Sequence, residues 1–216
     1  MINNLLSEKE ISIFNNIIKD LEAPKDDFGN FIFDDQYDQS TDIAVSKYLG
    51  RVQFNIKNIG ELFPTISSGP GSPKSLVKRL TELAESITEY SVRMSSITYV
   101  EYNSKYGKPQ LPPHWDGDSN DLIINYQFAS NTSWDIGIDF DVYKMEDNSA
   151  IIFNPNEKTH WRPHKIFNDG EYVKMIFFRF ENVNEKSDYS HLQKFWSTDE
   201  VFKEIEKFRD SLSIQN

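Results

Sequence analysis

The sequence changes character at Ile97-Thr98-Tyr99-Val100-Glu101-Tyr102, a run of β-branched and aromatic residues that is typical of a β-strand. Four further runs of the same kind follow, and turn signals separate them. They cover residues 122 to 129, 136 to 143, 150 to 154 and 172 to 180. At least five strands without an intervening helix predict an antiparallel sandwich or barrel.

Helices are expected on both sides of this β-rich region. Ser7-Glu8-Lys9-Glu10 has the S-x-x-E pattern of a capping box, and the apolar residues after it recur at helical spacing as far as Pro24. Ser72 and Pro73 follow a Gly-Pro break as the N-cap and first residue of a second helix. A last helix is expected from about 198 to 212, and residues 45 to 56 contain one or two strands. The predicted fold is mainly β with flanking helices.

Composition limits the chemistry that the chain can perform. Its 216 residues suit one domain, and the 14% of aromatic residues suit a barrel interior. The chain has no cysteine, so a metal site must use nitrogen and oxygen ligands. The formal charge of −11 opposes binding to nucleic acid. With neither a signal peptide nor eighteen consecutive apolar residues, we expect a soluble cytoplasmic protein that does not bind a membrane.

One short segment carries the strongest sign of chemistry. In Pro112-Pro113-His114-Trp115-Asp116, an imidazole and a carboxylate lie two residues apart, so an extended backbone points both to the same face. A second imidazole from a distant strand would complete two histidines and one carboxylate, which is the ligand set of non-haem iron. Alternatively, His114 caps a turn and Asp116 is a solvated carboxylate.

Residues 94 to 182 resemble the 2-oxoglutarate/iron(II) oxygenase superfamily, in its small, prolyl 4-hydroxylase-like branches. The resemblance rests on the order of the motifs: the strand 97–102, His114-Trp115-Asp116, Tyr126 to Asn131, Asp147 to Phe153, and His160-Trp161-Arg162. It implies a double-stranded β-helix, a jelly-roll or cupin-like barrel, and iron ligands at His114, Asp116 and His160. His164 is an alternative to His160, because a ten-residue spacing of the family connects it to Lys174, but the His-Trp-Arg pattern favours His160.

The same resemblance suggests residues that hold the co-substrate. A lysine inside the apolar strand 172–178 would be costly without an anion, so Lys174 is expected to bind the distal carboxylate of 2-oxoglutarate. Arg162 is its rival, since a guanidinium binds carboxylates in a bidentate way. The hydroxyl of Tyr102 could also reach the co-substrate, or Tyr102 is a core aromatic. Arg179 has the opposite strand parity from Lys174 and is expected at the surface. Asn125 and Gln127 share one strand face and could line the pocket.

The function implied by the resemblance is a dioxygenase that hydroxylates an unactivated C–H bond. It would use Fe(II), 2-oxoglutarate and O2, with ascorbate in support, on a small molecule, amino acid or peptide. The expected single oxygenase domain has an N-terminal support (1–93), a catalytic barrel (94–182) and a helical C-terminal segment (183–216). Two alternatives are a cupin-like metalloenzyme that does not use 2-oxoglutarate and a non-catalytic β-barrel binding module. The sequence does not determine the substrate or the oligomeric state.

Overall fold

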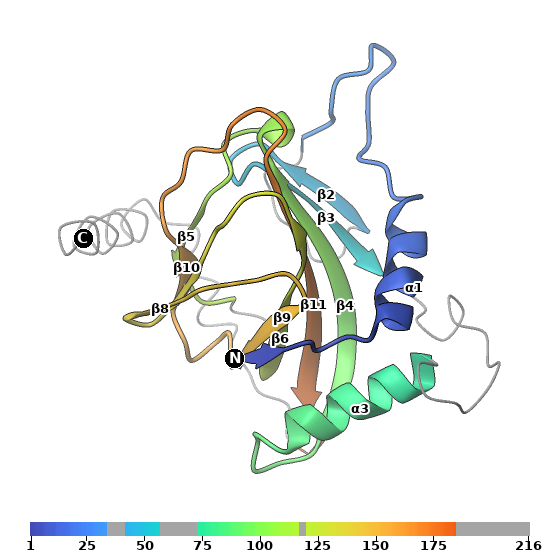
Figure 1. Cartoon of the computed structure of the whole chain (residues 1–216), viewed down its shortest axis with the longest axis vertical. Coiled ribbons are helices and arrows are strands. Elements are labelled where there is room, and N and C mark those ends of the chain that lie inside the picture. Colours follow the sequence, from blue (N-terminus) through green and yellow to red (C-terminus); the bar gives the residue numbers. More distant parts are fainter. Residues whose placement is uncertain (34–41, 57–72, 117–119, 185–216) are drawn as a thin grey trace.

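A computed structural model describes residues 1–33, 42–56, 73–116 and 120–184. Within these ranges the chain forms two antiparallel sheets and two α-helices (Figure 1). The larger sheet has the order β1 (Ile2–Asn3), β9 (Ser149–Phe153), β6 (Leu122–Ser130), β11 (Tyr172–Asn182), β4 (Val92–Asn103), β3 (Arg51–Ile56) and β2 (Ile43–Ser46). The smaller sheet has the order β5 (Leu111–His114), β10 (His160–Arg162), β7 (Ile136–Ile138) and β8 (Asp141–Tyr143).

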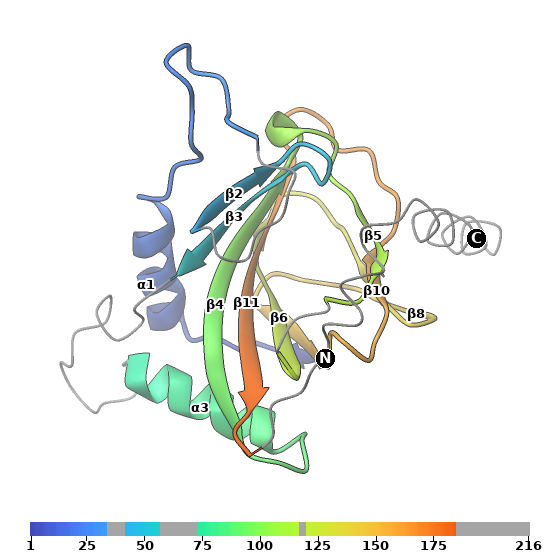
Figure 2. The ribbon, with the colours of Figure 1, turned by 180° about the vertical axis from the view of Figure 1, so that it is seen from behind.

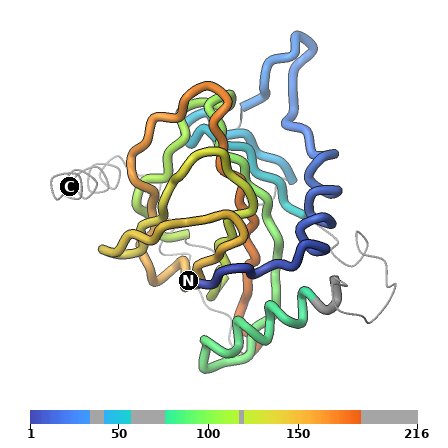
Figure 3. The backbone as a smooth tube through the Cα atoms, in the orientation of Figure 1, coloured from blue at the N-terminus to red at the C-terminus, as the bar shows by residue number. Residues whose placement is uncertain are grey.

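The two sheets face each other and enclose a core. Alternate residues of β11, namely Val173, Met175 and Phe177, pack against Ile136 and Ile138 of the smaller sheet and against other apolar residues of the barrel interior. Seen from behind and as a tube, the long strands β4 and β11 form one wall and the short strands form the opposite one (Figures 2 and 3). The chain alternates between the two sheets, so the expected double-stranded β-helix is confirmed.

The helices cover the outer face of the larger sheet (Figure 1). Helix α1 (Glu8–Ile18) begins with the predicted capping box: the Ser7 amide donates to Glu10 Oε2 over 2.7 Å, and the Glu10 amide donates to Ser7 Oγ over 3.3 Å. Helix α3 (Pro73–Glu85) begins at the predicted proline. Arg79 connects the two helices, because its Nη2 lies 3.1 Å from Glu10 Oε2. None of the helices in the described parts of the chain is long and apolar enough to span a membrane.

The five predicted strands are confirmed, and the structure adds strands that the sequence did not indicate. The run 136–143 divides into β7 and β8 at a turn where Asp139 has a φ of 52°. The expected connections 103–113 and 154–160 contain the 3-10 helix η1 (Ser104–Tyr106) and strand β5, and end at β10. Strands β5 and β10 complete the smaller sheet. The expected last helix, 198 to 212, lies outside the described residues.

Candidate metal centre

Two histidines meet because their strands pair in register. His114 ends β5 and His160 begins β10, and the two residues are direct cross-strand partners. Their ring centroids are 4.0 Å apart. Strand β5 lies at the edge of the smaller sheet, which is where a strand containing Pro112 and Pro113 fits, because proline cannot donate to a neighbouring strand. The register therefore brings together two imidazoles that are far apart in the sequence.

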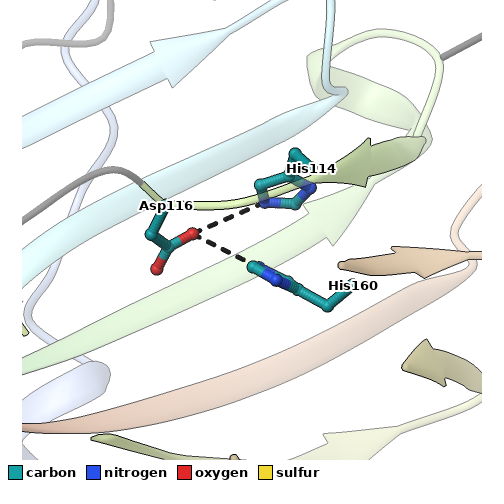
Figure 4. A group of neighbouring side chains, drawn as sticks. All are labelled: His114, Asp116 and His160. Carbon is teal, nitrogen blue, oxygen red and sulfur yellow. Dashed lines mark ion pairs between the residues drawn. The ribbon is translucent and has the colours of Figure 1, made fainter. Parts of the chain in front are cut away.

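Asp116 completes the group two residues beyond His114 (Figure 4). Its amide donates to the carbonyl of Pro155 over 3.0 Å, which holds this segment against the turn after β9. Its Oδ1 lies 3.3 Å from Nε2 of His160 and 3.6 Å from Nε2 of His114. One ligand atom from each residue lies within 4.8 Å of the other two. The structure thus places the three predicted metal ligands together.

The hydrogen-bond partner of Nδ1 shows where each imidazole carries a proton. Nδ1 of His114 is 2.8 Å from the carbonyl of Pro112, and Nδ1 of His160 is 3.2 Å from the carbonyl of Lys158. A carbonyl only accepts, so each Nδ1 carries a proton and each Nε2 faces Asp116. In the neutral ring of His114 this Nε2 presents a lone pair. The two Nε2 atoms and one carboxylate oxygen therefore face one another. A cation bound by these three atoms would stabilise this arrangement.

The ionisation of the group also suits a metal. Burial, and next the charge of His160, lower the pKa of His114 from its usual 6.5 to about 3, so the ring is neutral at pH 7. Burial opposes ionisation of Asp116, but the hydrogen bond and charge of His160 and the charge of Arg179 outweigh it and lower the pKa of this carboxyl. At neutral pH the site therefore offers a neutral His114 imidazole and one carboxylate, beside the imidazole of His160.

Arg179 is a site residue that the sequence reasoning misplaced. We expected it at the surface, but this is wrong: it is 8% exposed and its Nη2 lies 3.7 Å from Oδ2 of Asp116. The larger sheet is covered on both faces, so the parity opposite to Lys174 directs a side chain into the barrel instead of into solvent. The apolar residues Val173, Met175 and Phe177, which share this parity, were the signal that could have placed it.

Arg162 lies inside the barrel, beyond the histidines. Its Nη1 donates to the carbonyl of Trp134, its Nη2 is 3.3 Å from the sulfur of Met175, and its guanidinium lies 4.9 Å from the Trp134 ring centroid. Burial lowers the pKa of Arg162 to about 10, so it keeps its charge at neutral pH. Tyr102 is 1% exposed and packs edge-on against the same Trp134 ring at 5.0 Å. Arg162 and Tyr102 thus line one part of the interior.

Lys174 does not share this position. It pairs with Glu101 and Ala129, and its Nζ lies 4.9 Å from the ring centroid of Tyr172. Ile176 and Phe178, which have its parity, belong to the core under the helices, whereas Val173 and Met175 face the barrel interior. The expectation that Lys174 meets an anion inside the barrel is corrected: its strand directs it to the other face of the sheet.

Two further polar residues belong to the interior face of the larger sheet. Asn125 pairs across the sheet with Phe177, is 4% exposed, and has an Oδ1 with no hydrogen-bond partner among the described residues. Arg51, which the sequence analysis did not single out, donates from Nη1 to the Tyr102 hydroxyl over 3.0 Å, and its charge helps to lower the pKa of His114. The alternation of β3, with Val52 and Phe54 in the outer core, could have indicated this.

The other residues considered for the site differ in their positions. Gln127 lies on the interior face, where its Nε2 donates to Asp147 Oδ1 over 3.3 Å. His164 is exposed and does not belong to the ligand group. Trp161, beside His160, packs directly on Gly137. Asp118, two residues beyond Asp116, could be mistaken for the ligand from the sequence, but the His-x-Asp spacing selects Asp116, and Asp118 lies outside the described residues.

Comparison with known proteins adds the relatives of the fold. No family model matches the sequence, and no curated protein matches it. Among solved structures, AviO1 from Streptomyces viridochromogenes Tue57 superposes with a TM-score of 0.52 at 13% identity, covering 86% of this chain and 90% of that one. An oxidoreductase of the 2OG-Fe(II) oxygenase family from Burkholderia pseudomallei gives a TM-score of 0.50 at 8% identity, covering 88% and 85%. The chain has the 2-oxoglutarate oxygenase fold. At these identities the likeness concerns the fold alone.

Proposed function

We propose that this chain is an iron(II)- and 2-oxoglutarate-dependent oxygenase that hydroxylates an unactivated C–H bond. The observation that carries the proposal is the convergence of two imidazole nitrogens and one carboxylate oxygen inside a barrel of the 2-oxoglutarate oxygenase fold. Other chemistries occur on related barrels, so the fold by itself would not support an activity. Two nitrogen ligands and one oxygen ligand on one metal are what distinguish this site.

The residues fit iron(II) by their donor types. His114, Asp116 and His160 supply two nitrogens and one oxygen, which are ligands that suit iron better than calcium or magnesium, and the described residues hold no thiolate. Both Nδ1 atoms are held by backbone carbonyls, which fixes the rings before a metal arrives. Bound there, iron(II) would supply the oxidative chemistry with O2 and 2-oxoglutarate.

Arg162 is the residue that we propose for the distal carboxylate of 2-oxoglutarate, with Tyr102 beside it. The guanidinium is buried among Trp134, Met175 and the barrel wall, and a buried cation is stabilised by an anion that reaches it. Asn125 presents an unpaired oxygen to the same interior and is a candidate to orient the co-substrate. This assignment replaces Lys174, which lies on the other face of its strand.

The protein itself would bind, orient and exclude water. The ring of Phe153 packs at 5.1 Å from the His160 ring, and apolar residues fill the interior on the side of Met175. Apolar surroundings of this kind exclude water and would protect a reactive oxidant from side reactions. We propose a small molecule, an amino acid or a peptide as the substrate class, acted on by a single-domain enzyme, with ascorbate as a supporting reductant.

The test is metal-dependent turnover of 2-oxoglutarate. Purified protein with iron(II), ascorbate and 2-oxoglutarate should release succinate, and an untargeted mixture of metabolites should yield a product heavier by one oxygen. Iron binding without succinate would indicate the cupin-like metalloenzyme, and absence of iron binding would indicate the non-catalytic binding module. Either result would contradict the proposed function.

A further inference from the structure

The carboxylate of Asp116 has two oxygens with different surroundings. Oδ1 faces the two Nε2 atoms at 3.3 and 3.6 Å, while Oδ2 faces Nη2 of Arg179 at 3.7 Å. Both side chains are largely buried, with 14% of Asp116 and 10% of Arg179 exposed. A carboxylate can bind a metal through one oxygen or through both. The charge of Arg179 is placed to favour the first mode.

We propose that Arg179 is a positioning residue that restricts Asp116 to one metal-binding oxygen. This inference rests on the proposed function, since the restriction matters for a metal that must accept a chelating co-substrate. An octahedral ion with two imidazoles and one carboxylate oxygen keeps three positions, which suffice for a keto acid and dioxygen. With both carboxylate oxygens bound, only two positions would remain.

The backbone around Arg179 is built to hold this side chain in place. Arg179 pairs with Ser96, but Phe180 pairs with Met94, so Ser95 is an extra residue in β4. The Ser95 hydroxyl closes this bulge, lying 3.1 Å from the Arg179 carbonyl and 2.5 Å from Oδ1 of Asn120. Bulges are frequent beside functional sites, where they direct a side chain.

The same bulge connects to the segment that holds Asp116. Nδ2 of Asn156 donates to the Asn120 carbonyl over 2.6 Å, and the neighbouring Pro155 carbonyl accepts the Asp116 amide over 3.0 Å. The backbone of Asp116 and the backbone of Arg179 are therefore fixed relative to each other through Asn120 and Asn156. The contact between carboxylate and guanidinium is supported from both sides, as expected for a ligand oriented by its outer partners.

The test uses cobalt(II) as a spectroscopic probe and N-oxalylglycine as an unreactive keto acid analogue. In Arg179→Met, Co(II) should bind as well as in the unmodified protein, but its visible spectrum should change because the second carboxylate oxygen joins the metal. Affinity of the Co(II) protein for N-oxalylglycine should fall about tenfold or more, the scale of one lost coordination or charge-assisted contact. Arg179→Lys keeps the charge, so its Co(II) spectrum and its affinity for N-oxalylglycine should lie between those of the unmodified protein and those of Arg179→Met.

Controls separate positioning from other effects. Arg93→Met removes an arginine that pairs with Glu181 at 2.7 Å in the same sheet but outside the site, and it should leave both readouts unchanged. In an Asp116→Ala background, Arg179→Met should have no further effect on N-oxalylglycine binding. If it does, Arg179 contacts the analogue directly and the inference is overturned.

The remaining outcomes are also decisive. An unchanged spectrum and unchanged N-oxalylglycine affinity in Arg179→Met, with Co(II) bound, would overturn the inference and leave the proposed function intact. Failure of the unmodified protein to bind Co(II) or iron(II) would overturn both. If Arg179→Met does not fold, as judged by thermal unfolding of the metal-free protein, Arg179→Lys decides by the same two measurements.

Discussion

Nη2 of Arg162 lies 3.3 Å from the sulfur of Met175, so a cation from the smaller sheet rests on the interior face of the larger one. This contact places positive charge deep in the barrel, at a point where Lys174, one residue before Met175, is directed away. The proposed site for the distal carboxylate of 2-oxoglutarate therefore depends on a residue of β10.

Replacing Arg162 should weaken the use of 2-oxoglutarate. Arg162→Ala should raise the concentration needed for half-maximal succinate release about tenfold or more, because one charge-assisted contact is lost. Lys174→Ala serves as the control and should leave this concentration nearly unchanged. The assignment fails if the lysine variant shows the larger effect.

His160 and His164 should differ sharply in metal binding. His160→Ala should abolish succinate release and weaken metal affinity, because Nε2 of His160 faces Asp116 at 3.3 Å. His164→Ala should leave both largely intact, since this side chain is exposed and outside the group. Calorimetric titration with Mn(II) measures the affinity. Equal losses in the two variants would contradict the ligand assignment.

Asp116 should determine the reaction outcome. In the superfamily that the sequence resembles, halogenating members commonly have a small residue here, which admits chloride. With Asp116 present, mass spectrometry should detect a hydroxylated and not a chlorinated product in chloride buffer. Asp116→Ala should eliminate hydroxylation, and Asp118→Ala should retain it. Full hydroxylation activity of Asp116→Ala would contradict this prediction.

The metal-free protein should lose stability in mild acid. The pKa of His114 is about 3 in the folded chain and 6.5 in the unfolded one, so the unfolded state takes up a proton first. The stability contributed by the neutral ring is present above pH 6.5 and is lost as the pH falls from 6.5 towards 3. Thermal unfolding with a chelator measures this, and His114→Gln should show a flatter pH profile over that range.

Gly137 should resist substitution because the indole of Trp161 lies where a Cβ would be. Gly137→Ala should destabilise the chain by about 1–3 kcal/mol through overpacking, and it should also weaken metal binding because Trp161 adjoins His160. Chemical denaturation and Mn(II) titration test both effects. Adding Trp161→Leu should relieve the clash, so the double variant should be less destabilised than the sum of the single variants. Additive losses would argue against it.

Sequence reasoning succeeded where local patterns carry the signal. The capping box at Ser7, the proline that begins α3 and the long strands β4, β6 and β11 were all predictable, because each follows from neighbouring residues. The short strands β5 and β10 were not, since β5 has two prolines among its four residues and β10 has three residues, too few for a clear alternation. Those strands form through cross-strand register, which is a property of the folded barrel.

The candidate site was predictable as a set of residue types and less so as a geometry. His114, Asp116 and His160 could be chosen by motif order, and the structure brings them together. Strand parity misled us at Arg179 and Lys174, because we took one face of β11 as solvent-facing when both faces are covered. Parity separates two faces of a strand, but tertiary packing determines what each face meets.

The pairing of β5 with β10 connects the metal centre to the order in which the chain folds. The two imidazoles become neighbours only when these strands, far apart in the sequence, close the smaller sheet. The chain loses loop entropy when it makes a contact of such range. A chain in which β5 and β10 have not paired therefore has no complete ligand set. Metal uptake would then report the closure of the smaller sheet, and the bound metal would stabilise the closed sheet.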